Sequence, residues 1–265
     1  MSVKINSLLK QWPRKAVVVQ SWLNHQGITR QLAAAYEKSS WINRIGRGAF
    51  MRADDQQVEW TGGLYAIQTQ MQFPIHVGGK TALQWQGYAH FLPLGQEGSS
   101  VVLFGLPNVK LPAWFSQYDW GIQVNFFTGN LFAPAPFLGL TTKMIEASYS
   151  MTLSAPERAI MECLYLIPQV ESFEEAKLLM ESLMTLRPHL VQALLEACQS
   201  VKVKRLFLFL AEKYHHTWFR YLDLSKLNLG KGKRVIGDGG HFNAKYQLSV
   251  PDRQAIYECE GQSFF

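Results

Sequence analysis

The chain has 265 residues, which is enough for one large domain or two smaller ones. Hydrophobic residues make up 48% and charged residues 17%, so the composition excludes a disordered chain and is typical of a globular protein. No apolar run is long enough for a transmembrane helix, and residues 1–10 lack the apolar stretch of a secretory signal. We therefore expect a cytoplasmic protein with no membrane contact.

Cysteine usage supports the same compartment. Cys163, Cys198 and Cys259 lie far apart and do not form a Cys-x-x-Cys pair. This spacing is typical of free thiols in a reducing environment and predicts neither a disulfide nor a metal site.

Positive charge is concentrated in two blocks of the chain. Residues 1–60 hold 9 Lys and Arg against 4 Asp and Glu, and residues 201–250 hold 10 against 3, whereas residues 156–200 hold 3 against 7. Such blocks attract polyanions because binding releases condensed counterions. The distribution favours contact with nucleic acid over two ordinary solvated surfaces.

The N-terminal segment predicts three helices followed by a small hairpin. The helices are expected over residues 2–9, 17–25 and from Thr29 to about 38, with Trp12-Pro13 ending the first, Gly27 in the turn before the third, and strands over 41–45 and 49–51. This order is that of a winged helix-turn-helix, whose third helix enters the major groove of DNA while the hairpin forms a wing.

That interpretation predicts a set of DNA-binding residues. The third helix presents the side chains at its start to base edges, and arginine and glutamine are suited to bidentate contacts with guanine and adenine. A cationic wing suits phosphate or minor-groove contact. The expected DNA-binding residues are Thr29, Arg30, Gln31, Tyr36, Lys38, Arg44, Arg47 and Arg52. The alternative is a module for protein contacts whose arginines are merely solvated.

The rest of the chain predicts mixed α/β structure and then helices. Up to residue 154 we expect helices over 60–71 and 81–88 and strands over 75–77, 101–104, 122–127 and 149–153. From Pro156 the expected helices are 156–167, 172–184 with a capping box at Ser172 and Glu175, 188–199 and 201–214, followed by a late strand over 246–250. A possible second basic surface comprises Lys202, Lys204, Arg205, Lys231, Lys233 and Arg234.

Motifs for catalysis or cofactors are weak. Gly79-Lys80-Thr81 suggests a phosphate-binding loop, but Pro74 occupies the position where that motif requires its first glycine. His215-His216 lacks the spacing of a helical zinc pair. The sequence therefore predicts no catalytic residue, no cofactor and no metal, and it does not predict an enzyme.

The chain resembles the AbiEi-type antitoxins of bacterial type IV toxin–antitoxin systems, which are linked to abortive phage infection. The resemblance rests on the order of short motifs along nearly the full length, to about Pro251. They lie at residues 21–23, 27–32, 41–42, 45–50, 76–83, 87–90, 111–115, 154–159, 201–207, 222–226 and 230–234. The chain departs in its small-sided third helix, Ala33-Ala34-Ala35, which leaves Arg30, Gln31 and the wing to carry base specificity.

The resemblance implies an autorepressor that binds double-stranded DNA at promoter repeats. It further implies a C-terminal domain that supplies antitoxicity and assists repression, and a nucleotidyltransferase-like toxin that is counteracted without a stable complex. The predicted fold is α+β, with a winged helix-turn-helix over residues 1–57 and a C-terminal antitoxin domain over 58–265. That domain is α/β up to 154 and mainly helical from 155. A nucleic-acid-processing enzyme and a protein-interaction module remain as alternatives.

Overall fold

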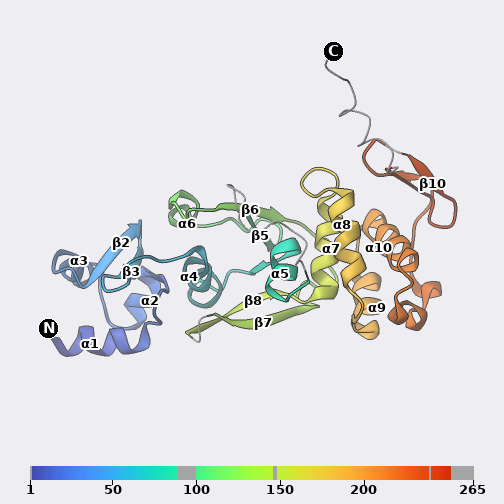
Figure 1. Ribbon diagram of the computed structural model, residues 1–265. Coiled ribbons are helices and arrows are strands. Elements are labelled where there is room, and N and C mark those ends of the chain that lie inside the picture. The colour runs from blue at the N-terminus through green and yellow to red at the C-terminus, as the bar shows by residue number, and fades with distance from the viewer. Residues whose placement is uncertain (1, 89–99, 146–147, 239, 252–265) are drawn as a thin grey trace, which may run out of the picture. The chain divides into compact units, whose positions relative to one another are not determined.

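The computed structural model describes residues 2–88, 100–145, 148–238 and 240–251 (Figure 1). The protein has an α+β fold, as predicted, and its residues form two compact units. Unit 1 consists of Met1–Thr81, Leu94–Gly129 and Leu140–Ser154, and unit 2 consists of Ala82–Pro93, Asn130–Gly139 and Ala155–Phe265. The domain limits predicted at residues 57 and 154 stay predictions. In the part of the chain that the structure describes, every helix is too short or too polar to cross a bilayer.

Unit 1 begins with helices followed by a hairpin, in the predicted order. The elements are α1 (Ser2–Gln11), β1 (Val18–Val19), α2 (Gln20–His25), α3 (Arg30–Lys38), β2 (Ile42–Gly46) and β3 (Ala49–Arg52). The prediction of a helix from residue 17 is wrong at its start, because Val18 and Val19 form a strand that pairs antiparallel with β3. The two valines are β-branched and buried, which suits a strand better than a helix.

These elements enclose a small core of apolar side chains. The indole N–H of Trp12 donates a hydrogen bond of 2.8 Å to the carbonyl of Ala16, which closes the chain between α1 and β1. The core residues are Ile5, Leu8, Trp12, Val17, Val18, Leu23, Ile28, Ala33, Ile42, Ala49 and Phe50. This core determines which faces of α2, α3 and the hairpin are buried and which faces remain exposed to solvent.

The rest of unit 1 contains a five-stranded mixed sheet and the short helices that accompany it. The order of the sheet is β6-β5-β4-β8-β7, from β4 (Ile75–Val77), β5 (Ser100–Gly105), β6 (Gln123–Thr128), β7 (Leu140–Ile145) and β8 (Tyr149–Ser154). Strands β4, β5, β6 and β8 were predicted, whereas β7 and the short helix α6 (Ala113–Gln117) were not. Strand β7 is exposed along most of its length, so it lacks the apolar alternation on which a sequence-based prediction depends.

The predicted helix over 60–71 is two elements, α4 (Trp60–Tyr65) and a π-helix η1 (Ala66–Gln70). The π-helix carries two glutamines that bond to strand backbones. Gln70 accepts from the amide of Val19 at 2.9 Å and donates to the carbonyl of Val17 at 3.2 Å. Gln68 accepts from the amide of Thr152 at 2.9 Å and donates to its carbonyl at 3.0 Å. The π-helix therefore ties β1 to the five-stranded sheet.

Unit 2 is mainly helical, as predicted. Its helices are α7 (Pro156–Leu166), α8 (Phe173–Ser182), α9 (Pro188–Ala197), α10 (Val201–Lys213), and the 3-10 turns η2 (Thr217–Tyr221) and η3 (Leu224–Lys226); α5 (Gly79–Trp85) follows β4. The start signals are confirmed, because Pro156 occupies the first turn of α7 and the Ser172 hydroxyl accepts from the amide of Glu175. Helix α7 lies against α8, α9 and α10 (Figure 1).

Buried charge in α7 accounts for part of the acidic block over residues 156–200. The Glu157 carboxylate receives two hydrogen bonds of 2.9 Å from the Arg187 guanidinium. Burial opposes ionisation of Glu157, yet the bonds from Arg187 hold its pKa below the ordinary value. Arg158 donates to Glu162 at 2.8 Å one turn further on. These acidic residues stabilise unit 2 and are not part of a solvated acidic face.

A three-stranded sheet ends the described chain. Its order is β10-β11-β9, from β9 (Arg234–Val235), β10 (His241–Asn243) and β11 (Leu248–Val250). The late strand predicted over 246–250 is present in its last three residues, whereas β9 and β10 were not predicted. Strands of two or three residues are too short to show a period-two pattern.

Candidate nucleic-acid interface

The start of α3 is an exposed polar surface beside an open hollow. Thr29 caps the helix, with its hydroxyl accepting from the amide of Leu32 at 3.3 Å, and Gly27 supplies the left-handed turn before it at φ +73°. The hollow has a volume of about 630 Å³ and is lined by Asn24, Gly27, Thr29, Arg30 and Gln31. Three of the predicted base-reading residues are therefore together, exposed and next to a concave surface.

The outer face of α3 has a spacing that suits a groove. Ala33 and Tyr36 are buried, so Arg30, Ala34 and Lys38, each four residues from the next, form an exposed stripe. The small side chain of Ala34 between two cations lets the helix backbone approach a ligand closely. Only one alanine of the Ala33-Ala34-Ala35 run, Ala34, is exposed.

The hairpin tip lies at Arg47, between Gly46 and Gly48. Gly48 has a left-handed φ of +76°, and its carbonyl accepts from the amide of Gln20 at the start of α2 at 2.8 Å. A Cβ atom at Gly46 would lie 2.7 Å from the Cβ of Trp114 in α6, so the hairpin backbone packs directly on that helix. The exposed Arg47 side chain thus lies on a hairpin tip that contacts both α2 and α6.

Arg44 joins the hairpin to α3. Its guanidinium makes a bidentate pair with Glu37, with N–O distances of 3.0 and 2.7 Å, and lies 4.9 Å from the centroid of the Phe50 ring. The hydrogen bond from Arg44 holds the pKa of Glu37 below its ordinary value. Both side chains remain partly exposed, so Arg44 stays at the surface with its charge partly neutralised.

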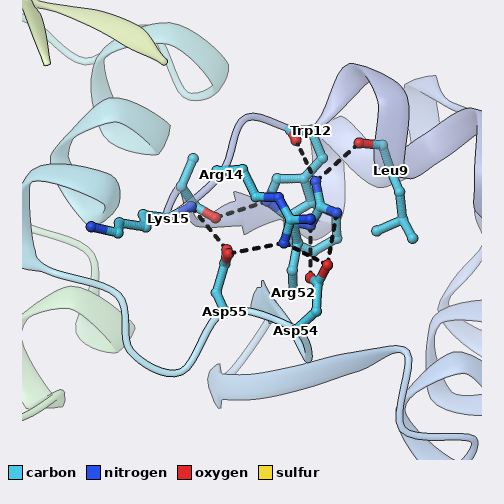
Figure 2. A network of polar contacts seen from close by, with 8 residues as sticks. Leu9, Trp12, Arg14, Lys15, Arg52, Asp54 and Asp55 are labelled. Atoms are coloured by element: carbon cyan, nitrogen blue, oxygen red, sulfur yellow. Dashed lines mark hydrogen bonds and ion pairs between the residues drawn. The ribbon is translucent and has the colours of Figure 1, made fainter. Parts of the chain in front are cut away.

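Two of the predicted DNA-binding side chains are buried instead. Tyr36 is 4% exposed and packs in the core between α3 and the hairpin, where burial raises the pKa of its hydroxyl. Arg52 is 7% exposed, and Figure 2 shows its guanidinium directed toward Leu9 near the end of α1 and Trp12 just after it. It donates to the carbonyls of Leu9 and Trp12, both at 3.1 Å, and pairs with Asp54. Both side chains are therefore packed within the fold, with little of their surface exposed.

Only some of the cations predicted to form a second basic surface are exposed. Lys204 and Arg205 are buried, and the ammonium of Lys202 donates to the carbonyl of Tyr165 at 2.8 Å. Lys231 and Lys233 are exposed, whereas Arg234 is half-buried. The difference follows from burial: most residues of α10 are buried, Lys204 and Arg205 among them, whereas Lys231 and Lys233 lie in an exposed loop.

Asn24 is the residue of the hollow that sequence reasoning missed. It lies in the last turn of α2 and its side-chain oxygen accepts from the Gln20 carboxamide at 2.9 Å. The sequence signal that could have identified Asn24 is its position in the last turn of the helix before Gly27, because the turn at Gly27 brings that position next to the start of α3.

The weaker motifs of the sequence have structural roles in the described chain. The Thr81 hydroxyl accepts from the amide of Val102 at 2.9 Å, within the helix that begins at Gly79. His216 is buried, its Nε2 lies 2.8 Å from the carbonyl of Met180, and burial lowers its pKa. Within the described residues no group of three or more His, Cys, Asp or Glu is arranged to hold a metal ion.

Comparison with known proteins places the chain in a family. Residues 1–94 match a model described as "Transcriptional regulator, AbiEi antitoxin N-terminal domain", and residues 98–251 match one described as "Transcriptional regulator, AbiEi antitoxin, Type IV TA system". The chain belongs to the AbiEi antitoxin family. The family resemblance inferred from the motifs is thereby confirmed, and the two AbiEi models together span both basic blocks.

A solved structure shares the fold. The RV2827C protein from Mycobacterium tuberculosis is similar over 92% of this chain and 89% of its own, with a TM-score of 0.62 and 14% sequence identity. At that identity the likeness shows the fold alone. No curated protein matches the chain.

Proposed function

We propose that this AbiEi family member is a DNA-binding autorepressor in which α1 to β3 act as a winged helix-turn-helix. The observation that carries the proposal is the exposed start of α3, where Thr29, Arg30 and Gln31 adjoin an open hollow. A helix of this kind fits the major groove with its first residues on base edges. Arg47 at the hairpin tip then contacts phosphate or the minor groove.

The proposed interface is narrower than the one predicted from the sequence. It comprises Thr29, Arg30, Gln31, Lys38 and Arg47, with Asn24 added. Arg44 contributes through its pair with Glu37, which fixes the hairpin relative to α3. Tyr36 and Arg52 are left out because they are buried.

The test is binding of the full chain to duplex DNA from upstream of its own gene, measured by fluorescence anisotropy across a salt series. Arg30→Ala should weaken specific binding by about 5- to 100-fold and relax discrimination at one base pair. Arg47→Ala should weaken binding to all duplexes and lower the salt slope by about one. Lys143→Ala, an exposed lysine on β7 of the same unit, is the matched control and should leave affinity unchanged. Equal losses for all three variants, or none, would contradict the proposal.

We further propose that the chain counteracts a nucleotidyltransferase-like toxin without forming a stable complex and without a catalytic step of its own. Membership of the AbiEi family supports this, because its members are described as antitoxins of type IV systems. Co-expression with the adjacent toxin should restore growth, while size-exclusion chromatography of the two purified proteins should show separate peaks. Co-elution at micromolar concentration would refute the absence of a stable complex.

A further inference from the structure

One face of the β10-β11-β9 sheet carries two exposed apolar side chains, Val235 and Phe242, next to exposed lysines. Strand β11 pairs Ser249 with Val235 on one side and with Phe242 on the other, so these three side chains lie in one row on one face. Val235 is 55% exposed and Phe242 is 46% exposed, whereas Ser249 between them is buried, as are Leu248 and Val250 on the opposite face.

Two exposed lysines, Lys231 and Lys233, lie near these apolar side chains. Lys233 stands two residues before Val235 and therefore on the same side of the chain, and its ammonium lies 5.2 Å from the centroid of the Phe242 ring. Lys231 is exposed two residues earlier in the same loop. We call the surface formed by Lys233, Val235 and Phe242 the Phe242 face; Ser249, between the two apolar side chains, is 3% exposed.

A buried arginine of α10 forms hydrogen bonds with the loop that carries the lysines. Arg205 of α10 is 2% exposed, and its guanidinium donates to the carbonyls of Leu229 at 2.8 Å, Gly230 at 3.2 Å and Gly232 at 2.6 Å. It also donates to Gln247 at 3.3 Å, just before β11. One buried side chain thus fixes both the basic loop and the strand behind it, so the Phe242 face is ordered before any ligand arrives.

We propose that the Phe242 face binds single-stranded nucleic acid. An exposed aromatic ring on a sheet offers a stacking surface to any base, and adjacent lysines attract the phosphates that follow it. The exposed Lys231 and Lys233 supply the positive charge that a polyanion requires, whereas Lys204 and Arg205 of the same block are buried. Duplex DNA fits less well, because its bases are stacked on one another and cannot reach the ring.

This site is separate in sequence and in chemistry from the proposed duplex-binding start of α3. Variants can therefore distinguish the two. Phe242→Ala should weaken single-strand binding and spare duplex binding, whereas Arg30→Ala should do the reverse.

The experiment measures fluorescence anisotropy of labelled, unstructured 12-nucleotide RNA and DNA single strands with the full chain. Phe242→Ala should weaken binding at least about fivefold, and Phe242→Trp should preserve it. Lys233→Gln should lower the salt slope by about 0.7, the value for one phosphate contact on a single strand. An RNA-only signal would identify RNA as the ligand, and equal signals would support single strands of either kind.

The chain offers a matched control on the same unit. Tyr221 is 62% exposed and lies under Arg220 at 4.8 Å, so it is also an exposed aromatic ring with a cation, but it lies in the 3-10 turn η2 and not on a sheet. Tyr221→Ala should leave single-strand binding unchanged. Equal losses for Tyr221→Ala and Phe242→Ala, or wild-type binding by Phe242→Ala with an unchanged melting temperature, would overturn the proposal. Preferential binding to anionic vesicles or to an acidic peptide over single strands would overturn it as well.

Discussion

Replacing Arg52 by methionine tests whether this arginine stabilises the fold or contacts DNA. The sequence places Arg52 beside the hairpin as a DNA-binding cation, whereas the structure buries it against Leu9 and Trp12 (Figure 2). Methionine keeps most of the aliphatic volume and removes the charge and the donors. The substitution therefore isolates the hydrogen bonds from the packing.

The expected loss can be estimated from the contacts. Arg52 donates to two backbone carbonyls, Leu9 and Trp12, which are left without this donor in the variant. Its pair with Asp54 adds little, because the Asp54 side chain is 50% exposed. Two charge-assisted bonds in a buried setting, less the packing that methionine retains, amount to about 2–4 kcal/mol of unfolding free energy. For a chain of this size that corresponds to roughly 5–15 °C in melting temperature.

The assay pairs denaturant unfolding with anisotropy on duplex DNA. Arg52→Met should lower stability by the amount above and keep its DNA affinity at temperatures where it is folded. Arg47→Ala, the matched control at the exposed hairpin tip, should keep its stability and lose affinity. Unchanged stability in Arg52→Met together with a loss of affinity like that of Arg47→Ala would refute the structural role.

The pH dependence provides a second check of the same contact. The hydrogen bond from Arg52 holds the pKa of Asp54 below its ordinary value, with a smaller contribution from Arg14. A carboxyl with a lowered pKa contributes stability that is present above its unfolded pKa and is lost as pH falls through its folded pKa. Acid destabilisation below about pH 5, as pH falls through the ordinary pKa of Asp54 and then its lowered folded pKa, should therefore be shallower in Arg52→Met than in the wild type.

Three further substitutions or reactions test other parts of the structure. Glu37→Gln removes the acidic partner of Arg44 at the proposed interface. Because the pair is partly exposed, the unfolding free energy should change by less than about 1 kcal/mol. Duplex binding should become tighter in anisotropy measurements. Gly62→Ala should lower unfolding free energy by about 3 kcal/mol or more in denaturant titrations, because the added Cβ would lie 2.0 Å from the carbonyl oxygen of Lys15. Burial raises the pKa of Cys198 to about 11, so iodoacetamide should label it slowly in the native state at pH 8 and quickly after unfolding, as measured by mass spectrometry.

Each of these has an outcome that would contradict it. Weaker duplex binding by Glu37→Gln would mean that the orientation of Arg44 matters more than its charge. Gly48→Ala is the control for Gly62→Ala, since its added Cβ would meet only Gln20 at 3.8 Å and the left-handed φ should cost about 1–2 kcal/mol. Equal losses for the two glycines would show that backbone freedom, and not the contact with Lys15, decides the effect. Rapid native labelling of Cys198 would show that its burial is transient.

Local signals in the sequence were sufficient for the elements that have strong ends and regular periods. Thr29 after Gly27 located the start of α3, Pro156 located α7, and Ser172 located α8. Strand β1 was misassigned because Val18 and Val19 adjoin a helix of compatible apolar pattern, and only pairing with β3 separates the two. The π-helix could not be predicted for a similar reason, since its glutamines form hydrogen bonds with backbone groups up to 84 residues away.

The proposed DNA-binding residues divide in the same way. Arg30, Gln31 and Arg47 could be named from the sequence because a capped helix start and a glycine-flanked turn expose whatever residues they carry. Arg52 could not be distinguished from them, since a cation in a hairpin looks the same whether it faces solvent or a pair of carbonyls. Arg205 belongs to the same class, because its partners lie 24 to 42 residues away.

By itself the sequence determined the α+β class, the AbiEi family and the exposed start of α3, because these depend on composition, on motif order and on interactions within a few residues. The tertiary structure alone decided which cations remain at the surface. Burial of an arginine requires hydrogen-bond acceptors supplied by distant backbone, and the chain brings them together only when it folds. The two basic blocks of the sequence thus became a short exposed surface near Arg30 and Arg47, which we propose binds duplex DNA, and a separate pair of exposed lysines, Lys231 and Lys233, near Phe242.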